Sequence, residues 1–285
     1  MTTVADFFAS VKARLATILG SAAEGDAAAR VLLEDIAGYD RKYLFMNGDR
    51  EILPFKMQKV DAAVAAIAAG EPVQYAAGKA LFMGMMLTVT PAVLIPRFET
   101  EGLVDMVTDA AGSTSDLRVL DIGTGSGCIA IALARALTFP AVSAVDISAD
   151  ALAVARTNAA AMKVNIDFRQ LDILRTAPPA EPHFDIVVSN PPYVTDSERA
   201  DMDPRVADHE PSGALFVPDS DPMRFYRAIA AYAAAALVRG GRIFLEINQN
   251  CPDEVKGVLA GAGFADITVS RDYKGNYRYA SAVMP

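Results

Sequence analysis

The stretch that decides the fold is Val119-Leu120-Asp121-Ile122-Gly123-Thr124-Gly125-Ser126-Gly127-Cys128. It reads as a buried strand, a glycine loop and the start of a helix that continues from Ile129. Glycine lets the backbone turn without a Cβ clash and lets a ligand approach the main chain closely. A dinucleotide fingerprint has the spacing G-x-G-x-x-G, and Cys128 stands where its third glycine would be. The spacing present, G-x-G-x-G with an acid two residues earlier, favours a cofactor with an amino-acid end and no phosphate, such as S-adenosylmethionine.

Two more acids are expected at the same edge of the predicted sheet. Asp146 ends the next strand, where its carboxylate can accept from both hydroxyls of a ribose. Asp172 ends the third strand, where it can accept from an adenine amino group while Ile173 covers the ring. Ligands of open α/β sheets bind at the carboxyl ends of the strands. We therefore predict a cofactor site made of Gly123, Thr124, Gly125, Ser126, Gly127, Asp146, Asp172 and Ile173.

The chain after Ser115 alternates between strand and helix patterns. Strands are predicted over 118–122, 142–146, 166–171, 184–189, 242–247, 267–271 and 277–283. Helices fit between most of them, for example over 149–161, 222–238 and 252–262. This order predicts an α/β fold with a seven-stranded, mostly parallel, doubly wound sheet. The last two strands lack a helix between them and should form an antiparallel hairpin around Lys274-Gly275-Asn276.

The first part of the chain has helical periodicity. Apolar residues recur at helical spacing from Val4 to Leu19, and further helices fit 26–37 and 54–69. A short hairpin is expected within Leu81–Thr90. We predict three parts: an all-α substrate-recognition domain over 1–75, a hairpin linker over 76–95 and a methyltransferase domain over 96–285.

The motif Ser189-Asn190-Pro191-Pro192-Tyr193, which closes a predicted strand, indicates the chemistry. The lone pair of an amide or base amino nitrogen is delocalised, and acceptors for both N–H groups free it for attack. The Asn190 side-chain oxygen and the Pro191 carbonyl are such acceptors, and the prolines bring no competing N–H. Tyr193 adds a flat face that tolerates a nearby sulfonium. We predict Asn190, Pro191, Pro192 and Tyr193 as catalytic residues; the alternative is a buried strand that the prolines simply stop.

Bulk properties limit the partners. The 285 residues carry a net charge of −9, which disfavours binding to duplex DNA. The two cysteines and two histidines have no spacing that suits a metal or disulfide framework. No apolar run is long enough to span a membrane, and no secretory signal is evident, so we expect a cytoplasmic protein. The sequence carries no signal for an oligomer, and a monomer is favoured.

Over nearly its whole length the chain resembles the bacterial protein-(glutamine-N5) methyltransferases that modify peptide chain release factors. The most specific matching segment is Ile95-Pro96-Arg97-Phe98-Glu99-Thr100-Glu101. The other matching segments are Glu71–Tyr75, Asp121–Gly127, Asn190–Tyr193, Glu210-Pro211 with Ala214–Phe216, and Phe225–Arg227.

The resemblance implies the fold of a class I S-adenosylmethionine-dependent methyltransferase. It also implies that the helical domain contacts the release factor and that the methyl group goes to the glutamine of its Gly-Gly-Gln loop. Asn190 and the Pro191 carbonyl would hold that amide with Tyr193 packed against it, and Asn190 would also line the cofactor. Arg97 and Phe98 would lie near the methyl group. The chain departs from the family at Phe98, where proline is usual, and at Ser212-Gly213, which replaces an arginine-containing stretch. The alternatives are glutamine methylation of a ribosomal protein, methylation of adenine or guanine amino groups in nucleic acid, and a non-catalytic binding module on the same fold.

Overall fold

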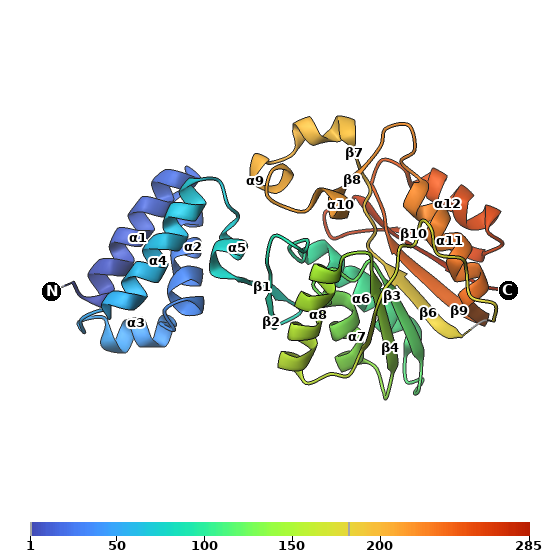
Figure 1. The fold of residues 1–285 in the computed structure, drawn as a ribbon, viewed down its shortest axis with the longest axis horizontal. Coiled ribbons are helices and arrows are strands. Elements are labelled where there is room, and N and C mark those ends of the chain that lie inside the picture. Colours follow the sequence, from blue (N-terminus) through green and yellow to red (C-terminus); the bar gives the residue numbers. More distant parts are fainter. Residues whose placement is uncertain (1, 182) are drawn as a thin grey trace. The chain divides into compact units, whose positions relative to one another are not determined.

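The computed structural model describes residues 2–181 and 183–285, which form two compact units (Figure 1). The first unit contains the residues up to Lys79 together with Asp203–His209. The second contains Ala80–Met202 and Glu210–Pro285. The segment Asp203–His209 follows the Asn190 motif in the chain but belongs to the first unit.

The first unit is helical. Its helices are α1 (Val4–Leu19), α2 (Ala22–Asp35), α3 (Arg41–Asn47), α4 (Pro54–Ala68), α5 (Val73–Ala77) and α9 (Pro204–Ala207). The side chains of Thr3, Ser21 and Asp40 cap α1, α2 and α3 by accepting from backbone N–H groups. The Ser21 cap makes α2 begin four residues before the predicted start. Helices α3 and α5 were not predicted, because each is too short to show a full apolar period.

The second unit contains a seven-stranded sheet in the order β10-β11-β9-β6-β3-β4-β5. Its strands are β3 (Arg118–Ile122), β4 (Ala141–Asp146), β5 (Asp167–Gln170), β6 (Phe184–Ser189), β9 (Leu237–Glu246), β10 (Ala265–Arg271) and β11 (Tyr277–Val283). Strands β5, β4, β3, β6 and β9 are parallel, and β11 is antiparallel to both of its neighbours. The predicted fold class and the terminal hairpin are therefore confirmed.

Helices cover both faces of this sheet (Figure 1). Helices α6 (Phe98–Ala111), α7 (Cys128–Ala136) and α8 (Ala149–Met162) pack with one set of strand residues, which includes Val119 and Val188. Helices α11 (Arg224–Ala236) and α12 (Pro252–Gly261) pack with the alternate set, which includes Leu120 and Val187. This alternation along β3 and β6 is what a strand buried on both faces requires.

Short elements complete the second unit. Strands β1 (Lys79–Phe82) and β2 (Met85–Thr88) form the predicted hairpin, and its turn residues Met83 and Gly84 both have positive φ, as a tight two-residue turn demands. After the Asn190 motif come β7 (Val194–Thr195) and the 3-10 helix η1 (Asp196–Asp201). Helix α10 (Ser212–Leu215) leads into β8 (Phe216–Val217), which pairs in parallel with β7.

Two of the strand boundaries that bear on the site were predicted wrongly. Strand β9 begins at Leu237 instead of 242, because Leu237 already pairs with Phe184 of β6. A register shift follows, and Gly240, within it, has a φ of +80°. Strand β5 ends at Gln170, so Asp172 lies in the following loop and does not end the strand. The side chain of Asp172 makes a local turn there by accepting from the backbone N–H of Leu174.

Candidate active site

The glycine loop between β3 and α7 is anchored by its neighbouring strand. The N–H groups of Gly123 and Thr124 both donate to the carbonyl of Val145, at 2.8 and 3.0 Å. Gly125 has a φ of +54°, and no heavy atom lies within 4 Å of the position that a Cβ would take. At Gly127 a Cβ would lie 3.1–3.4 Å from atoms of Ile131 and Ala155, so the glycine allows α7 and α8 to pack closely. The loop is thus held in place by β4, and its main chain can be approached closely by a ligand.

Asp146 ends β4 beside this loop, as predicted. Its Oδ2 accepts from the N–H of Gly125 and its Oδ1 from the N–H of Ser148, each at 2.9 Å. Burial raises the pKa of this carboxyl above its ordinary value. Each carboxylate oxygen can accept more than one hydrogen bond, so the group can also accept from a diol.

Asp121 lies beneath the loop and is fully buried. The Thr124 hydroxyl donates to its Oδ2 at 2.7 Å, while its Oδ1 makes no hydrogen bond to any residue that the structure describes. Burial, offset in part by the Thr124 hydrogen bond, raises the pKa of Asp121 to about 7. A buried acid with an unpaired oxygen suits a cationic neighbour, such as the ammonium or sulfonium of an amino-acid cofactor.

Asp172 and Ile173, the other predicted cofactor residues, follow β5. Asp172 Oδ1 accepts from Leu174 at 2.9 Å, and its Oδ2 lies 3.5 Å from Arg175 Nε. Ile173 is partly buried against the sheet core on the side of α11 and α12. The backbone N–H of Leu171 donates to the Asp146 carbonyl, which holds this loop beside the end of β4.

Asn190 stands directly after β6, which runs beside β3. The Ser189 hydroxyl donates to the Ile122 carbonyl at 2.6 Å and so joins the ends of these two strands. The Asn190 side chain donates through Nδ2 to Thr100 Oγ1, at 3.2 Å, and Oδ1 has no partner among the described residues. Pro191 is buried, and Pro192 and Tyr193 are half-buried.

Tyr193 is held by its hydroxyl. That hydroxyl donates to Glu246 Oε1 at 3.1 Å and accepts from Arg278 Nη1 at 3.2 Å. Burial raises the pKa of Tyr193 well above its ordinary value, so the hydroxyl stays protonated. The backbone carbonyl of Tyr193 accepts from Asn248 Nδ2 at 3.1 Å, which fixes the main chain after the prolines.

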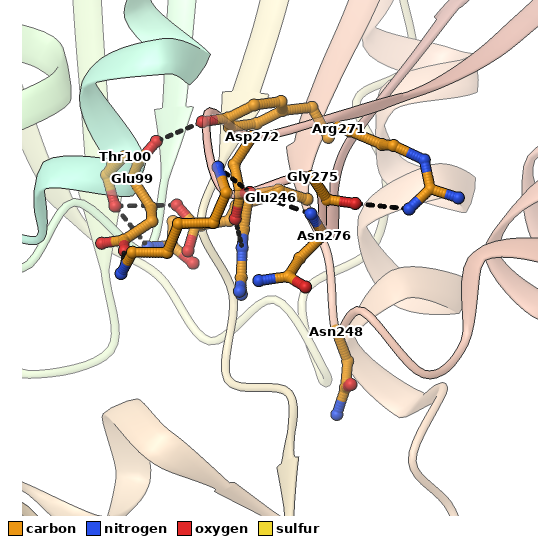
Figure 2. Close-up of polar contacts among 12 residues, drawn as sticks. Glu99, Thr100, Glu246, Asn248, Arg271, Asp272, Gly275 and Asn276 are labelled. Carbon is orange, nitrogen blue, oxygen red and sulfur yellow. Dashed lines mark hydrogen bonds and ion pairs between the residues drawn. The ribbon is translucent and has the colours of Figure 1, made fainter.

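Glu246 and Thr100 were not predicted as site residues. Glu246 ends β9 with 1% of its surface exposed, and burial raises its pKa. The Thr100 hydroxyl, from the first turn of α6, donates to Glu246 Oε2 at 2.7 Å (Figure 2). A single acid in the otherwise apolar run Ile243–Ile247 was the sequence signal for Glu246. Thr100 lay within the most specific matching segment, but no role followed from its position alone.

Arg97 and Phe98 stand at the start of α6. Arg97 Nη2 lies 2.5 Å from Glu210 Oε1, and the N–H of Ile95 donates to Glu210 Oε2. Phe98 is 63% exposed and packs edge-on against Tyr273, with ring centroids 5.2 Å apart. Arg97 is therefore paired with a buried acid, and Phe98 offers an exposed aromatic face.

The turn between β10 and β11 lies close to Thr100 and Glu246 (Figure 2). Asp272 Oδ1 accepts from the N–H groups of Lys274 and Asn276, and its Oδ2 lies 3.4 Å from Arg278 Nε. Arg278 thereby links the turn to Tyr193.

Within 2–181 and 183–285, no group of three or more histidine, cysteine, aspartate or glutamate side chains could hold a metal ion. In the same part of the chain, no helix combines the length and apolar character needed to cross a membrane.

A glycine loop after β3, an acid at the end of β4 and a seven-stranded sheet with an antiparallel β11 define the class: this is a class I S-adenosylmethionine-dependent methyltransferase fold. Residues 99–206 match the family model of the methyltransferase small domain, and residues 9–78 match that of the PrmC N-terminal domain.

Relatives identify the family. The release factor glutamine methyltransferase of Bacteroides thetaiotaomicron is 40% identical over 87% of this chain and 88% of its own. That of Cereibacter sphaeroides is 39% identical over 90% of each chain. The chain belongs to the release factor glutamine methyltransferase family.

Solved structures of more distant proteins share the fold. The Thermus thermophilus 16S rRNA N2 G1207 methyltransferase is 21% identical, with a TM-score of 0.53 over 73% of this chain and 50% of that one. A methyltransferase from Pyrococcus furiosus is 15% identical, with a TM-score of 0.52 over 77% of this chain and 96% of that one.

Proposed function

We propose that this protein transfers a methyl group from S-adenosylmethionine to the side-chain amide nitrogen of the glutamine in the Gly-Gly-Gln motif of peptide chain release factors. The observation that carries the proposal is the orientation of Asn190. Its Nδ2 is directed to Thr100, which leaves Oδ1 as an acceptor at the carboxyl edge of the sheet. An amide substrate has two N–H donors and needs acceptors of this kind.

In this mechanism the chain holds and orients the substrate amide. Asn190 Oδ1 and the Pro191 carbonyl accept from the two N–H groups, which favours a pyramidal nitrogen with its lone pair available. Tyr193, fixed through its hydroxyl, supplies a packing surface for the planar group. No general base is required to start the reaction, because geometry and acceptors lower the barrier.

The cofactor site consists of the glycine loop and the acids beside it. Gly123–Gly127 would line the amino-acid end of the cofactor, with Asp121 beneath the loop as a complement to its positive charge. Asp146 would accept from the ribose hydroxyls, and Asp172 and Ile173 would contact the adenine. When bound, S-adenosylmethionine would supply a methyl group from a sulfonium to the nitrogen lone pair; the C–S bond would break, S-adenosylhomocysteine would leave, and the nitrogen would lose one N–H proton to water.

The helical unit recognises the release factor in this proposal. The match of residues 9–78 to the PrmC N-terminal domain supports a family-specific role for this unit. The net charge of −9 favours a protein substrate over duplex DNA.

The direct test is incubation of the protein with methyl-labelled S-adenosylmethionine and a release factor that carries either Gly-Gly-Gln or Gly-Gly-Ala. We expect label only on the Gly-Gly-Gln protein. Equal labelling of both would overturn the assignment of the target. Parallel reactions with ribosomal proteins and with RNA test the other nitrogen targets, for which we expect background labelling.

A further inference from the structure

A chain of hydrogen bonds, one buried and three partly buried, connects Asn190 to residues that do not belong to its motif. From the α6 side, Asn190 Nδ2 donates to Thr100, whose hydroxyl donates to Glu246 Oε2. From the β11 side, Arg278 donates to the Tyr193 hydroxyl, which donates to Glu246 Oε1. Both series therefore end on the two oxygens of one carboxylate.

The direction of these hydrogen bonds is determined by chemistry. The Glu246 carboxylate can only accept, so the Tyr193 hydroxyl donates its proton to Glu246 and offers a lone pair to Arg278, which can only donate. The Thr100 hydroxyl likewise donates its single proton to Glu246, so Thr100 Oγ1 can only accept from the Asn190 side chain. A lone pair attracts the NH₂ end of an amide and repels its oxygen. The amide orientation with Oδ1 turned away from Thr100 is therefore the favoured one.

We propose that Thr100 and Glu246 are positioning residues that set the orientation of the Asn190 amide and so present Oδ1 to the substrate. This inference rests on the proposed function, because it concerns how the acceptor for a substrate amide is oriented. If the amide turned over, it would present NH₂ to the substrate's own N–H groups, which is a donor-to-donor contact. The network thus selects the orientation that accepts.

The first turn of α6 is itself fixed, so Thr100 has little freedom to adjust. The Tyr279 hydroxyl, from β11, donates to the Glu99 carbonyl at 2.6 Å. A Cβ at Gly102 would lie 2.3 Å from the Tyr279 hydroxyl oxygen, so this approach of β11 to α6 needs the glycine. Lys274 forms an ion pair with the Glu99 carboxylate at 2.7 Å. Strand β11 and its turn therefore hold the residue next to Thr100.

Arg278 is the cation that lies near the buried Glu246. Its guanidinium lies 3.4 Å from Asp272 and donates to Tyr193, beside the buried Glu246. A buried carboxylate without a cation nearby would be costly, and here it also receives two hydroxyl protons. The arrangement keeps both Glu246 oxygens as acceptors, which the directionality requires.

The test uses Thr100→Val, which preserves shape and removes the hydroxyl, with Thr100→Ser to restore it. Thr108→Val on the same helix is the matched control, because the Thr108 hydroxyl only donates to the Asp105 carbonyl on that helix. We expect Thr100→Val to lower kcat on the Gly-Gly-Gln release factor by roughly 10- to 100-fold, with the cofactor Kd within about twofold of wild type. Thr100→Ser should recover most of the rate, and Thr108→Val should leave it unchanged.

A double-mutant cycle separates positioning from general damage. If Thr100 acts through Asn190, Thr100→Val should lower kcat by no more than about twofold in an Asn190→Ala background. The same fold-loss in both backgrounds, or a wild-type kcat for Thr100→Val alone, would overturn the inference.

An NMR measurement tests the inference without any substrate. The Asn190 side-chain amide protons, identified by their loss in Asn190→Ala, should shift in Thr100→Val and return in Thr100→Ser. Unchanged resonances in Thr100→Val would refute the positioning role. If wild-type protein fails to methylate Gly-Gly-Gln while these resonances shift as expected, the proposed function fails and the positioning role is supported.

Discussion

The two halves of the candidate active site are built in different ways. The glycine loop is held by main-chain groups of the adjacent strand, through the Val145 carbonyl. Asn190 is oriented by side chains remote in sequence: Thr100 lies 90 positions away, and Thr100 and Glu246 are 146 positions apart. The cofactor half therefore depends on local backbone geometry, whereas the acceptor half depends on the assembled fold. This difference predicts that mutations in the two halves have separable effects.

The largest effect is expected at the acceptor. Asn190→Ala removes one preorganised hydrogen-bond acceptor and should lower kcat by roughly 10²–10³-fold, with little change in cofactor affinity. Steady-state kinetics with labelled cofactor, together with calorimetric titration of the cofactor, measure both quantities. The exposed Asn165 supplies the control, Asn165→Ala, which should behave as wild type. A cofactor Kd that rises as much as kcat falls would remove the distinction between the halves.

The opposite pattern is expected at the end of β4. Asp146→Ala removes a charged acceptor for the ribose and should weaken cofactor binding by roughly 10- to 100-fold, because hydrogen bonds to charged groups are worth about 1.5–3 kcal/mol each. Calorimetry measures this loss, and Asp150→Ala at an exposed site nearby is the control. An unchanged cofactor Kd would disprove the role given to Asp146.

Asp121, in the cofactor half of the site, makes the free energy of unfolding of the protein depend on pH. Its pKa is raised from 3.8 to about 7, so the folded protein binds this proton more tightly than the unfolded chain. The stability that the proton contributes is complete below the unfolded pKa and is lost as pH rises toward 7. Between pH 5 and 8, wild type should therefore lose about 2–3 kcal/mol relative to Asp121→Asn.

Urea unfolding at several pH values, without cofactor, measures this difference. Asp109→Asn, at an exposed position, should show no such pH-dependent gap. A gap between wild type and Asp121→Asn that stays constant with pH would contradict the buried, proton-binding state of Asp121.

The smallest effect is expected at Asn158 of α8, which supports the glycine loop from below. Its side chain pairs with both backbone groups of Thr88 and donates to the Ser126 carbonyl at 2.9 Å. Asn158→Ala should lower the free energy of unfolding by about 1–3 kcal/mol, because it leaves buried backbone groups unpaired. Urea unfolding measures it, and a wild-type midpoint would mean that these hydrogen bonds contribute nothing net.

The sequence predicted what depends on local pattern. Local patterns in one continuous segment predicted three features of the cofactor half. Hydrophobic periodicity indicated strand β3, glycine spacing indicated the loop from Gly123 to Gly127, and the end of the next strand indicated Asp146. The parallel sheet followed from the alternation of strands and helices, and the terminal hairpin followed from the lack of a helix between the last two strands. Asp172 was placed at a strand end and lies instead in a loop, because its side chain forms a turn with Leu174.

The network behind Asn190 could not be predicted in the same way. Thr100 and Glu246 meet only after α6 has packed on the sheet beside β9 and β11, and no local pattern encodes that contact. The acid in the apolar end of β9 showed that something polar was buried there, but its partners depend on tertiary structure. Likewise, Asp203–His209 follows the motif in sequence yet belongs to the helical unit.

The central claim is that one half of the site binds the cofactor and the other orients the substrate amide. Single-turnover methyl transfer to a Gly-Gly-Gln release factor, at saturating cofactor, tests it most directly with Asn190→Ala and Asp146→Ala compared side by side. We expect Asp146→Ala to recover a rate near that of wild type once cofactor saturates, while Asn190→Ala remains slow by roughly 10²–10³-fold. If saturating cofactor restored the rate of both variants, or of neither, the claim that the two halves have separate roles would be contradicted.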